Sequence, residues 1–417
     1  MSLQAHMLEM GRKARVAAQQ AASAPAKTRS DALRAAAARV RTQASAILEA
    51  NRQDLAAAGK KNLSAAFLDR MTLDAASVAA MAASIDAIAA QHDPLGEVIA
   101  EWVRPNGLAI ARVRTPLGVI GMIFESRPNV AADASALALR AGNAIILRGG
   151  ADAAASVEAV VTAFRAGLRD AGFPEDVVQA APSDREAVGA MLAGLEGAID
   201  LVVPRGGKSL VARVQEEARV PVLAHLEGVC HTYVHAAARE DRAIALTLNG
   251  KMRRVSVCGA TETLLIDRAA ARALLPPIVA ALRTAGCALR GDAEARDITP
   301  MEAADEDDWR AEYLAPVLAA RVVGGIEEAI AHIRRYGSQH TDCIVTEDAA
   351  AAERFLREVD SAIVLHNAST QFADGGEFGF GGEIGIATGK LHARGPVGIE
   401  QLCSFKYVVR GHGQTRP

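Results

Sequence analysis

The spacing of apolar residues changes along the chain and separates a helical region from later α/β regions. Residues 6–92 carry apolar side chains at helical spacing, as at Leu33, Ala37 and Val40, and so predict a series of helices. The segment Asp93-Pro94-Leu95-Gly96 ends this region, because proline and glycine interrupt helices. The region has no heptads of its own, so we expect it to pack on another layer.

From Leu108 the period becomes two, and strands then alternate with helices. Residues 117–124 form a near-continuous apolar run, which is typical of a strand buried on both faces. Ser183 and Glu186 form a capping-box pattern for a short helix. The alternation predicts a parallel sheet that binds its ligand beyond the carboxyl ends of its strands. The further elements expected are helices at 130–141 and 157–168 and strands at 144–147 and 199–203.

A second α/β series begins near Cys230. A glycine-rich stretch, Gly375 to Gly389, links it back to the first series. The final alternating run, 402–409, can pair with the run 108–114 or, through its edge, with another subunit. The strands expected in the second series lie at 232–234, 263–266, 343–346 and 362–365, and the helices at 269–285 and 326–336.

Composition narrows the classes of function. The chain has 417 residues, more than one core usually holds, and its formal net charge is −3. That charge implies no general attraction to nucleic acid or to an acidic membrane surface. Neither a signal peptide nor a run of the ~20 apolar residues that span a bilayer is recognisable, and the five cysteines are widely spaced without a CxxC pair. We therefore expect a cytoplasmic protein that acts on a small molecule.

Cys258 is the candidate for covalent chemistry. It lies between a basic turn that contains Arg253 and Arg254 and an apolar run typical of a strand. A free thiol titrates at about pH 8.5, and cationic neighbours lower that value and favour the thiolate. This placement indicates a catalytic nucleophile. The alternative is a buried cysteine that only packs as a small apolar side chain.

Two glycine-rich turns are candidates for binding phosphate groups. Arg148-Gly149-Gly150 and Arg205-Gly206-Gly207-Lys208-Ser209 each follow a strand and precede a helix, so backbone amides and a cation can meet a phosphate there. Such turns end many strands, but two on one sheet edge favour a nucleotide site. The stretch 375–383 is either a surface loop or backbone that closes on a cofactor, with Glu377 orienting a sugar.

The segment from His225 to His235 contains histidines and Cys230 at short spacing, as zinc sites do. His231 and His235 fall within one predicted strand, on the same face and ~13 Å apart. That distance is too long for both to bind one ion, so no metal site is expected.

Several motifs, in order along the chain, resemble the aldehyde dehydrogenase superfamily. These are Thr115–Gly121, Gly142–Arg148, a central cysteine and Glu377-Phe378-Gly379. A closer resemblance, from about residue 10 to 411, is to the members that reduce an acyl phosphate in proline synthesis. It rests on Ile123–Val130, Val202–Gly207, Glu227–His231, Leu391–Gly398 and Leu68–Arg70.

This resemblance implies an aldehyde dehydrogenase-like α/β fold of two Rossmann-like domains and a small β extension used for oligomerisation. The expected cofactor-binding domain comprises residues 1–98, 116–232 and 366–399, and the catalytic domain residues 233–365. The extension comprises residues 99–115 and 400–417. A homodimer or tetramer is expected, and the glutamate 5-kinase that makes the substrate is a further candidate partner.

The resemblance also implies an activity, which is the NADPH-dependent reduction of L-glutamate 5-phosphate to L-glutamate 5-semialdehyde through a thioester on Cys258. Arg127 stands where the superfamily carries an oxyanion-hole asparagine, and Glu227 lies near the base of its oxidising members. Candidate contacts to substrate or oxyanion are Arg127, Asn129, Arg254 and Arg394. Candidate cofactor-binding residues are Arg148, Gly149, Arg205, Gly206, Gly207, Ser209, Glu227, Glu377 and Phe378.

Three other functions stay open at this point. A hydrolytic semialdehyde dehydrogenase would resolve the thioester with water, and Glu227 would be its base. A non-catalytic NADP-binding relative would not need Cys258. A cysteine amidase would need a histidine partner, which sequence spacing does not identify.

Overall fold

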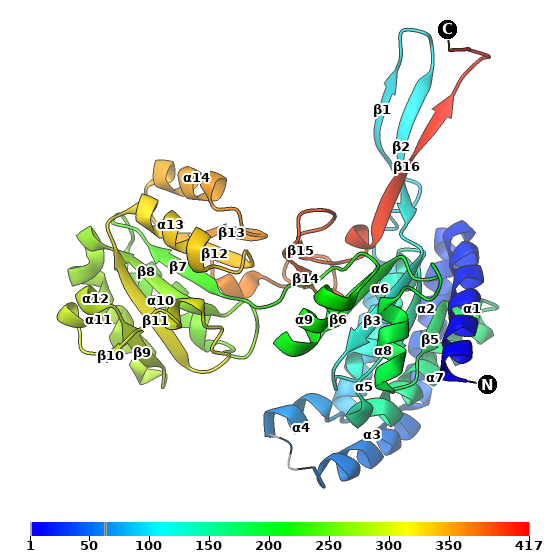
Figure 1. Ribbon diagram of the computed structural model, residues 1–417, viewed down its shortest axis with the longest axis horizontal. Coiled ribbons are helices and arrows are strands. Elements are labelled where there is room, and N and C mark those ends of the chain that lie inside the picture. Colours follow the sequence, from blue (N-terminus) through cyan, green and yellow to red (C-terminus); the bar gives the residue numbers. More distant parts are fainter. Residues whose placement is uncertain (1, 62, 64, 417) are drawn as a thin grey trace. The chain divides into compact units, whose positions relative to one another are not determined.

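The structure, a computed structural model, describes residues 2–61, 63 and 65–416, and the chain divides into two compact units (Figure 1). Unit 1 comprises Met1–Ala224, Gly379–Gly385 and Val397–Pro417. Unit 2 comprises His225–Phe378 and Ile386–Pro396. Each unit is described separately below.

The boundary between the units differs from the predicted one at residue 232. Strand β7 (Cys230–Val234) lies inside the sheet of unit 2, so the unit begins at His225 rather than at residue 233. The short helix η4 (Thr370–Phe372) also belongs to unit 2, because the hydroxyl of Thr370 bonds that of Thr261 at 3.0 Å. Unit 2 is therefore longer than the predicted second domain at both ends.

Unit 1 opens with the helical region that the sequence predicted. Leu33, Ala37 and Val40 of its second helix are fully buried, as their helical spacing requires. The helices are α1 (Leu3–Ser23), α2 (Ala26–Thr42), α3 (Ala44–Ala58), α4 (Ala65–Met71) and α5 (Ala75–Ala90).

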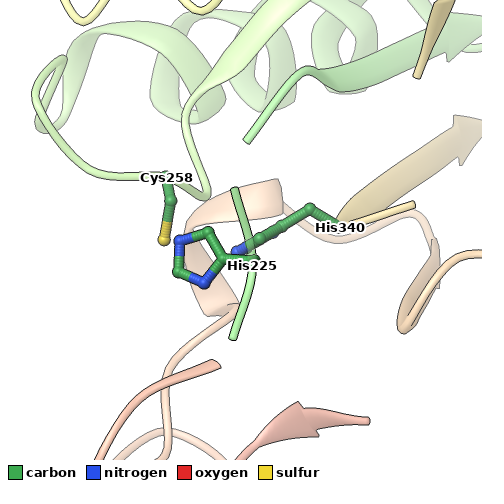
Figure 2. Close-up of side chains that lie close together, drawn as sticks. All are labelled: His225, Cys258 and His340. Carbon is green, nitrogen blue, oxygen red and sulfur yellow. The ribbon is translucent and has the colours of Figure 1, made fainter. Parts of the chain in front are cut away.

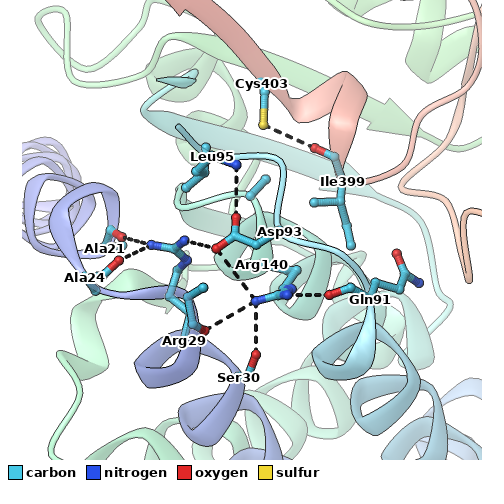
Figure 3. A network of polar contacts seen from close by, with 12 residues as sticks. Ala21, Ala24, Arg29, Ser30, Gln91, Asp93, Leu95, Arg140, Ile399 and Cys403 are labelled. Carbon is cyan, nitrogen blue, oxygen red and sulfur yellow. Dashed lines mark hydrogen bonds and ion pairs between the residues drawn. The ribbon is translucent and has the colours of Figure 1, made fainter. Parts of the chain in front are cut away.

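A buried charge network holds these helices to the break that follows α5 (Figure 3). The carboxylate of Asp93 accepts from Arg29 of α2 and from the backbone amide of Leu95, the latter at 3.0 Å. Arg140, from a later helix, lies 4.0 Å from Asp93 and donates to Ser30 at 3.0 Å. Buried charges are tolerated when they are paired and hydrogen-bonded in this way. The break at Asp93 is thus a fixed junction.

A parallel sheet of order β5-β4-β3-β6 forms the centre of unit 1. Every residue of β3 is buried, which confirms the strand expected from the apolar run. The strands are β3 (Val119–Phe124), β4 (Ala144–Arg148), β5 (Val178–Ala180) and β6 (Leu201–Arg205). The helices between and after them are α6 (Asn129–Arg140), α7 (Ala154–Asp170), α8 (Arg185–Leu192) and α9 (Lys208–Glu217).

The predicted capping box at Ser183 is wrong. The N-cap of α8 is Asp184, whose backbone is extended, and no side chain caps the helix. Ser183 lies one residue too early for this role, and its carbonyl oxygen instead accepts a hydrogen bond from Arg148.

An antiparallel β extension belongs to unit 1 and reaches away from its sheet (Figure 1). Its strands are β1 (Val98–Val103), β2 (Ala109–Pro116) and β16 (Cys403–Arg410). Cys403 lies opposite Pro116 and Arg410 opposite Ala109, so the prediction that the final run pairs with residues 108–114 is confirmed.

Unit 2 contains a parallel sheet of order β10-β9-β11-β8-β7-β12-β13. Three neighbouring inner strands, β7, β8 and β12, are buried along their whole length. The strands besides β7 are β8 (Thr261–Asp267), β9 (Ala288–Gly291), β10 (Glu302–Ala303), β11 (Val317–Val323), β12 (Thr341–Val345) and β13 (Ile363–His366).

The helices of unit 2 cover its sheet with aliphatic side chains, such as Leu275 and Ile278 packed near Leu264. They are α10 (Glu240–Met252), α11 (Arg268–Thr284), α12 (Ala293–Ile298), α13 (Ile326–Tyr336) and α14 (Ala349–Glu358). A short antiparallel pair, β14 (Ile386–Ala387) and β15 (Gly395–Pro396), completes the unit. Across the described residues, no helix is long and apolar enough to cross a membrane.

Candidate active site

One thiol and two imidazole side chains meet at one edge of the unit 2 sheet (Figure 2). His225 precedes β7, Cys258 precedes β8 and His340 precedes β12, and these strands are neighbours in the order β8-β7-β12. Because the strands are parallel, their amino ends lie together. One ligand atom of each residue lies within 4.8 Å of the other two. The site is therefore at the amino edge of this sheet, whereas the usual ligand edge of a parallel sheet is the carboxyl one.

The two histidines, rather than neighbouring arginines, set the ionisation of Cys258. Burial raises the pKa of this thiol, but the charge of His340 and polar contacts with His225 and His340 outweigh burial and hold the pKa well below its usual range. Arg253 and Arg254, which the sequence analysis credited with this effect, are both exposed, and Arg253 donates to Gln371 at 3.4 Å. Cys258 is half-buried, so its thiolate can meet a small molecule.

The Nδ1 atom of each histidine forms a hydrogen bond with a group outside the cluster. Nδ1 of His225 bonds the carbonyl oxygen of Ile386 at 2.8 Å, so this nitrogen carries the proton. Nδ1 of His340 bonds the hydroxyl of Thr341 at 2.8 Å. The His340 ring is fully buried, and its Nε2 has no hydrogen-bond partner among the described residues. The rings of His225 and His340 meet edge to face, with centroids 4.9 Å apart.

The turn that carries Cys258 is fixed by its neighbours. Cys230 donates its S–H to the Cys258 carbonyl oxygen at 3.1 Å, and burial raises the pKa of Cys230 well above its usual range, so this thiol stays protonated. Gly228 approaches the same carbonyl, and its own amide donates to Glu312 at 2.9 Å. Burial raises the pKa of Glu312, and the nearby Cys258 adds to that shift.

The predicted cofactor residues of unit 1 gather at the carboxyl edge of its sheet. Arg148 ends β4 and Gly149 follows it, while Arg205 ends β6 and Ser209 lies in the first turn of α9. A Cβ atom at Gly149 would lie 2.9 Å from Val157, so this glycine is needed for packing. Arg205 pairs with Glu383 at 3.6 Å.

The turn before α9 already holds an anion of the protein itself. The carboxylate of Glu125, from the end of β3, accepts the amide of Gly207 at 3.0 Å, and Gly207 is the N-cap of α9. Helix amino ends attract negative charge. The contact with the Glu125 carboxylate shows that this turn accepts a negative charge. A Cβ at Gly206 would come 2.7 Å from the same carboxyl group.

The predicted residues Arg127 and Asn129 lie between β3 and α6, also in unit 1. The amide of Arg127 donates to the Glu125 carbonyl at 2.6 Å, which makes a tight turn. Asn129 is the first residue of α6, and its exposed side chain bonds Asp133. Asn129 therefore contributes to the helix start.

The other predicted residues belong to unit 2. Arg394 bonds Asp360 at 2.9 Å and the carbonyl of Thr388 at 3.2 Å, so its guanidinium braces the β14–β15 segment. Arg254 is exposed beside the Cys258 turn. Glu377 is exposed and its amide bonds Asp374 at 3.3 Å, in a turn that also presents Phe378. Glu227 lies next to Gly228, in the segment that packs against Cys258.

Sequence reasoning missed His225 and His340. In the His225–His235 segment, His231 and His235, the two histidines weighed as a metal pair from their spacing, take separate partners: His231 contacts Asp342 at 2.8 Å and His235 contacts Thr346 at 2.8 Å. His225 was available in that segment, but only the pairing of β7 with β8 and β12 brings it to Cys258. That the segment forms no metal site stays a prediction, but His225 lies in a Cys/His cluster whose composition could hold an ion.

Comparisons with known proteins show the family to which the chain belongs. The chain belongs to the aldehyde dehydrogenase family, since the sequence profile of the Aldehyde dehydrogenase family matches residues 3–308. It is therefore an oxidoreductase of a family that uses a nicotinamide cofactor.

Within this family the chain groups with the gamma-glutamyl phosphate reductases. The protein of that name from Caulobacter sp. (strain K31) is 62% identical, and the alignment covers all of both chains. The crystal structure of gamma-glutamyl phosphate reductase from Thermotoga maritima has a TM-score of 0.96 and 41% identity, covering 99% of this chain and 100% of that one. The Saccharomyces cerevisiae protein of the same name has a TM-score of 0.53 and 30% identity, covering 98% of each chain. The recognition made from the sequence motifs is confirmed.

Proposed function

We propose that the chain catalyses the NADPH-dependent reduction of L-glutamate 5-phosphate to L-glutamate 5-semialdehyde, with release of phosphate. The observation that carries the proposal is the half-buried Cys258 held beside His225 and His340. Relatives that are 62% and 41% identical over essentially the full chain are named gamma-glutamyl phosphate reductase, which supports this choice of substrate.

Cys258 is the nucleophile of the first step. Its thiolate attacks the acyl carbon of the substrate, the bond from that carbon to the phosphate oxygen breaks, and a thioester remains on Sγ. Phosphate is a good leaving group, so the site needs no strong acid. His225 and His340 keep the thiolate populated at neutral pH, because they lower the pKa of Cys258.

The second step reduces the thioester. When bound, NADPH supplies the hydride. The backbone amide of Cys258 donates to the oxyanion that develops on the former carbonyl oxygen. Collapse of this tetrahedral adduct then breaks the C–S bond, releases the aldehyde and returns the thiolate, which the two histidines stabilise again. No water enters the reaction, so Glu227 is not needed as a base.

The cofactor-binding residues are those at the carboxyl edge of the unit 1 sheet. The α9 turn, with the Gly207 amide and the cations Arg205 and Lys208, would hold a phosphate group. Arg148 follows β4 on the same edge and adds a further cation. This positive charge favours NADPH, which carries one phosphate more than NADH. Glu377 and Phe378 are proposed to contact the nicotinamide and its ribose, because they match the family motif Glu377-Phe378-Gly379.

Arg127 is the proposed contact to an anionic group of the substrate. A guanidinium can bind a carboxylate or phosphate through two parallel hydrogen bonds, which an asparagine cannot do. Arg127→Ala should raise KM for the semialdehyde and leave the Kd of NADPH unchanged. An unchanged KM, or a weakened NADPH complex, would remove this assignment.

Self-association through the β extension is also part of the proposal. Its strands expose large apolar side chains, among them Trp102, Phe405 and Tyr407, with the Trp102 and Tyr407 rings 6.1 Å apart. Such exposed apolar clusters mark interaction surfaces. Trp102→Glu combined with Tyr407→Glu should reduce the mass measured by analytical ultracentrifugation; an unchanged mass would contradict the role. The kinase partner and the cytoplasmic location stay predictions.

The direct test is the reverse reaction. Glutamate semialdehyde and NADP⁺ are supplied with and without inorganic phosphate, and NADPH absorbance is followed for the wild type, Cys258→Ala and, as a matched thiol control, Cys343→Ala. The proposal expects NADPH only with phosphate and only when Cys258 is present. Formation without phosphate would indicate the hydrolytic dehydrogenase with Glu227 as base, and no NADPH under any condition would overturn the assignment.

A further inference from the structure

The donor atoms of His225, Cys258 and His340 form a cluster with the composition of a metal site. They lie within 4.8 Å of one another (Figure 2). One thiolate and two imidazole nitrogens are the ligand set of zinc-type divalent ions. In the reduction proposed above only the sulfur forms covalent bonds, and the two histidines act on it through charge and polar contacts; a metal ion would bind the same three atoms.

The contacts around the two rings are those of metal-binding histidines. A ligating histidine commonly donates its other ring nitrogen to a carbonyl or another acceptor, which fixes the tautomer and orients the ring. Nδ1 of His225 makes this bond to Ile386 at 2.8 Å, and Nδ1 of His340 meets the Thr341 hydroxyl at 2.8 Å. The fully buried Nε2 of His340 has no hydrogen-bond partner in the described part of the chain. A metal ion bound through this nitrogen would supply the missing partner.

The spacing of the donors requires only a small adjustment. With metal–nitrogen bonds of about 2.0 Å and metal–sulfur bonds of about 2.3 Å, tetrahedral ligands lie roughly 3.3–3.7 Å from one another. The present upper limit of 4.8 Å therefore has to shorten by about 1 Å. The backbone of the Cys258 turn is fixed, but the half-buried side chain can rotate about χ1, so Sγ can approach the two ring nitrogens and an ion can reach it. Three protein ligands leave a fourth position for water.

We propose that His225, Cys258 and His340 form a reversible inhibitory site for a zinc-type divalent ion, which competes with the substrate for Cys258. The inference rests on the proposed function, in which Cys258 is the nucleophile. A metal ion bonded to Sγ takes the electron pair that would attack the acyl carbon, so the metal-bound chain cannot form the thioester. Removal of the ion restores the free thiolate and the activity.

Binding is tested first, without substrate or nucleotide. The full-length chain, kept reduced with a non-thiol reductant, is titrated with Co²⁺ while the thiolate-to-cobalt charge-transfer absorption is recorded. One ion per chain is expected. The band should disappear in Cys258→Ser, and the Kd should rise at least tenfold in His225→Gln and in His340→Gln. Zn²⁺ should displace Co²⁺, and a chelator should remove both.

Cys230→Ser is the matched control, because its sulfur lies 3.7 Å from Nδ1 of His340 and is the other thiol near the cluster. The site predicts an unchanged cobalt band in this variant. A band that persists in Cys258→Ser, a band lost in Cys230→Ser, or no band at all would overturn the inference. Circular dichroism of each variant shows whether it is folded, and His225→Gln and His340→Gln supply independent results if Cys258→Ser is not.

Inhibition is tested separately in the phosphate-dependent reverse assay, with free Zn²⁺ set by a metal buffer. Zn²⁺ should inhibit the wild type competitively with the semialdehyde, and chelator should restore the full rate. A chain that reduces NADP⁺ but neither binds Co²⁺ nor responds to Zn²⁺ contradicts the metal site alone. A chain that binds Co²⁺ through Cys258 but shows no activity under any condition contradicts the proposed function alone.

Discussion

A Cβ atom at Gly228 would lie 2.0 Å from the carbonyl oxygen of Cys258. Real Cβ atoms do not approach a backbone oxygen so closely, so any larger residue at position 228 must displace the turn that presents the thiol. Displacement of a reacting group by about 1 Å can lower a rate by about 100-fold.

Gly228→Ala should therefore lower kcat by about 100-fold, because Cys258 no longer meets the substrate in the reacting geometry. Steady-state kinetics and the rate of Cys258 alkylation are the measurements. The control is Gly189→Ala in α8, where a Cβ meets nothing within 4 Å and kcat should not change. Full activity in Gly228→Ala would mean that the turn can shift without harm.

The two histidines should determine the pH dependence of Cys258 alkylation. Since they lower the thiol pKa, the thiolate is present at pH values below the usual thiol value of about 8.5, and it is lost only when the pH falls through the lowered pKa. Iodoacetamide should thus react quickly with the wild type at neutral pH. In His225→Gln and His340→Gln the rate at neutral pH should fall, while the rate at alkaline pH stays the same.

Cys258→Ala is the control for the alkylation rate, because any iodoacetamide that it consumes has reacted with other groups. The buried Cys343, whose pKa burial raises to about 12, should stay unreacted throughout. A pH profile that neither histidine variant changes would contradict the role of both rings.

Local pattern was enough to predict much of the fold. The buried run of β3 and the pairing of β16 with β2 follow from hydrophobic spacing, which is a property of neighbouring residues. The boundary at His225 was not predictable in this way, because β7 belongs to unit 2 through its pairing with β8 and β12. Such pairing depends on residues far apart in the sequence.

The site was predictable only in part for the same reason. Cys258 was recognisable from its basic turn and from the family motifs. His225 and His340 reach it because they precede strands that neighbour β8 in the sheet. Basic residues adjacent in sequence, such as Arg254, instead point to solvent. Adjacency in sequence was therefore a poor guide to the charges that act on the thiol.

Glu125 should weaken the binding of NADPH. Its carboxylate accepts a hydrogen bond from the amide of Gly207 at the start of α9, where the cofactor phosphate is proposed to bind. Glu125→Gln removes a negative charge from this helix end, which is worth about 0.3–1 kcal/mol, or roughly two- to fivefold in Kd. Fluorescence titration should show tighter NADPH binding by that factor.

Glu217→Gln is the control for this effect, because Glu217 is the last residue of the same helix and the charge change is identical. Its Kd should equal that of the wild type. If Glu125→Gln binds NADPH no more tightly, the phosphate does not lie on the α9 turn, and the Arg148 turn becomes the alternative.

Lys251 and Glu262 form a buried ion pair across the turn that carries Cys258. The carboxyl group of Glu262 should make the stability of the fold depend on pH. Lys251 lies in the last turn of α10 and Glu262 at the start of β8, both fully buried and in contact. Burial raises the pKa of Glu262 to about 7, although Lys251 opposes that shift. The folded chain therefore binds a proton more strongly than the unfolded chain, whose glutamate titrates near 4.5.

This difference fixes the sign of the pH effect. The contribution of Glu262 is fully present below pH 4.5 and is lost as the pH rises through about 7. In Glu262→Gln, which cannot ionise, the free energy of unfolding relative to the wild type should rise over this window by on the order of 3 kcal/mol. Urea unfolding at both ends of the window measures it. Glu353→Gln, at an exposed position of α14, is the control, and its free energy of unfolding should vary with pH as that of the wild type does. If the free energies of unfolding of Glu262→Gln and the wild type varied with pH in parallel, Glu262 would keep its charge in the folded chain.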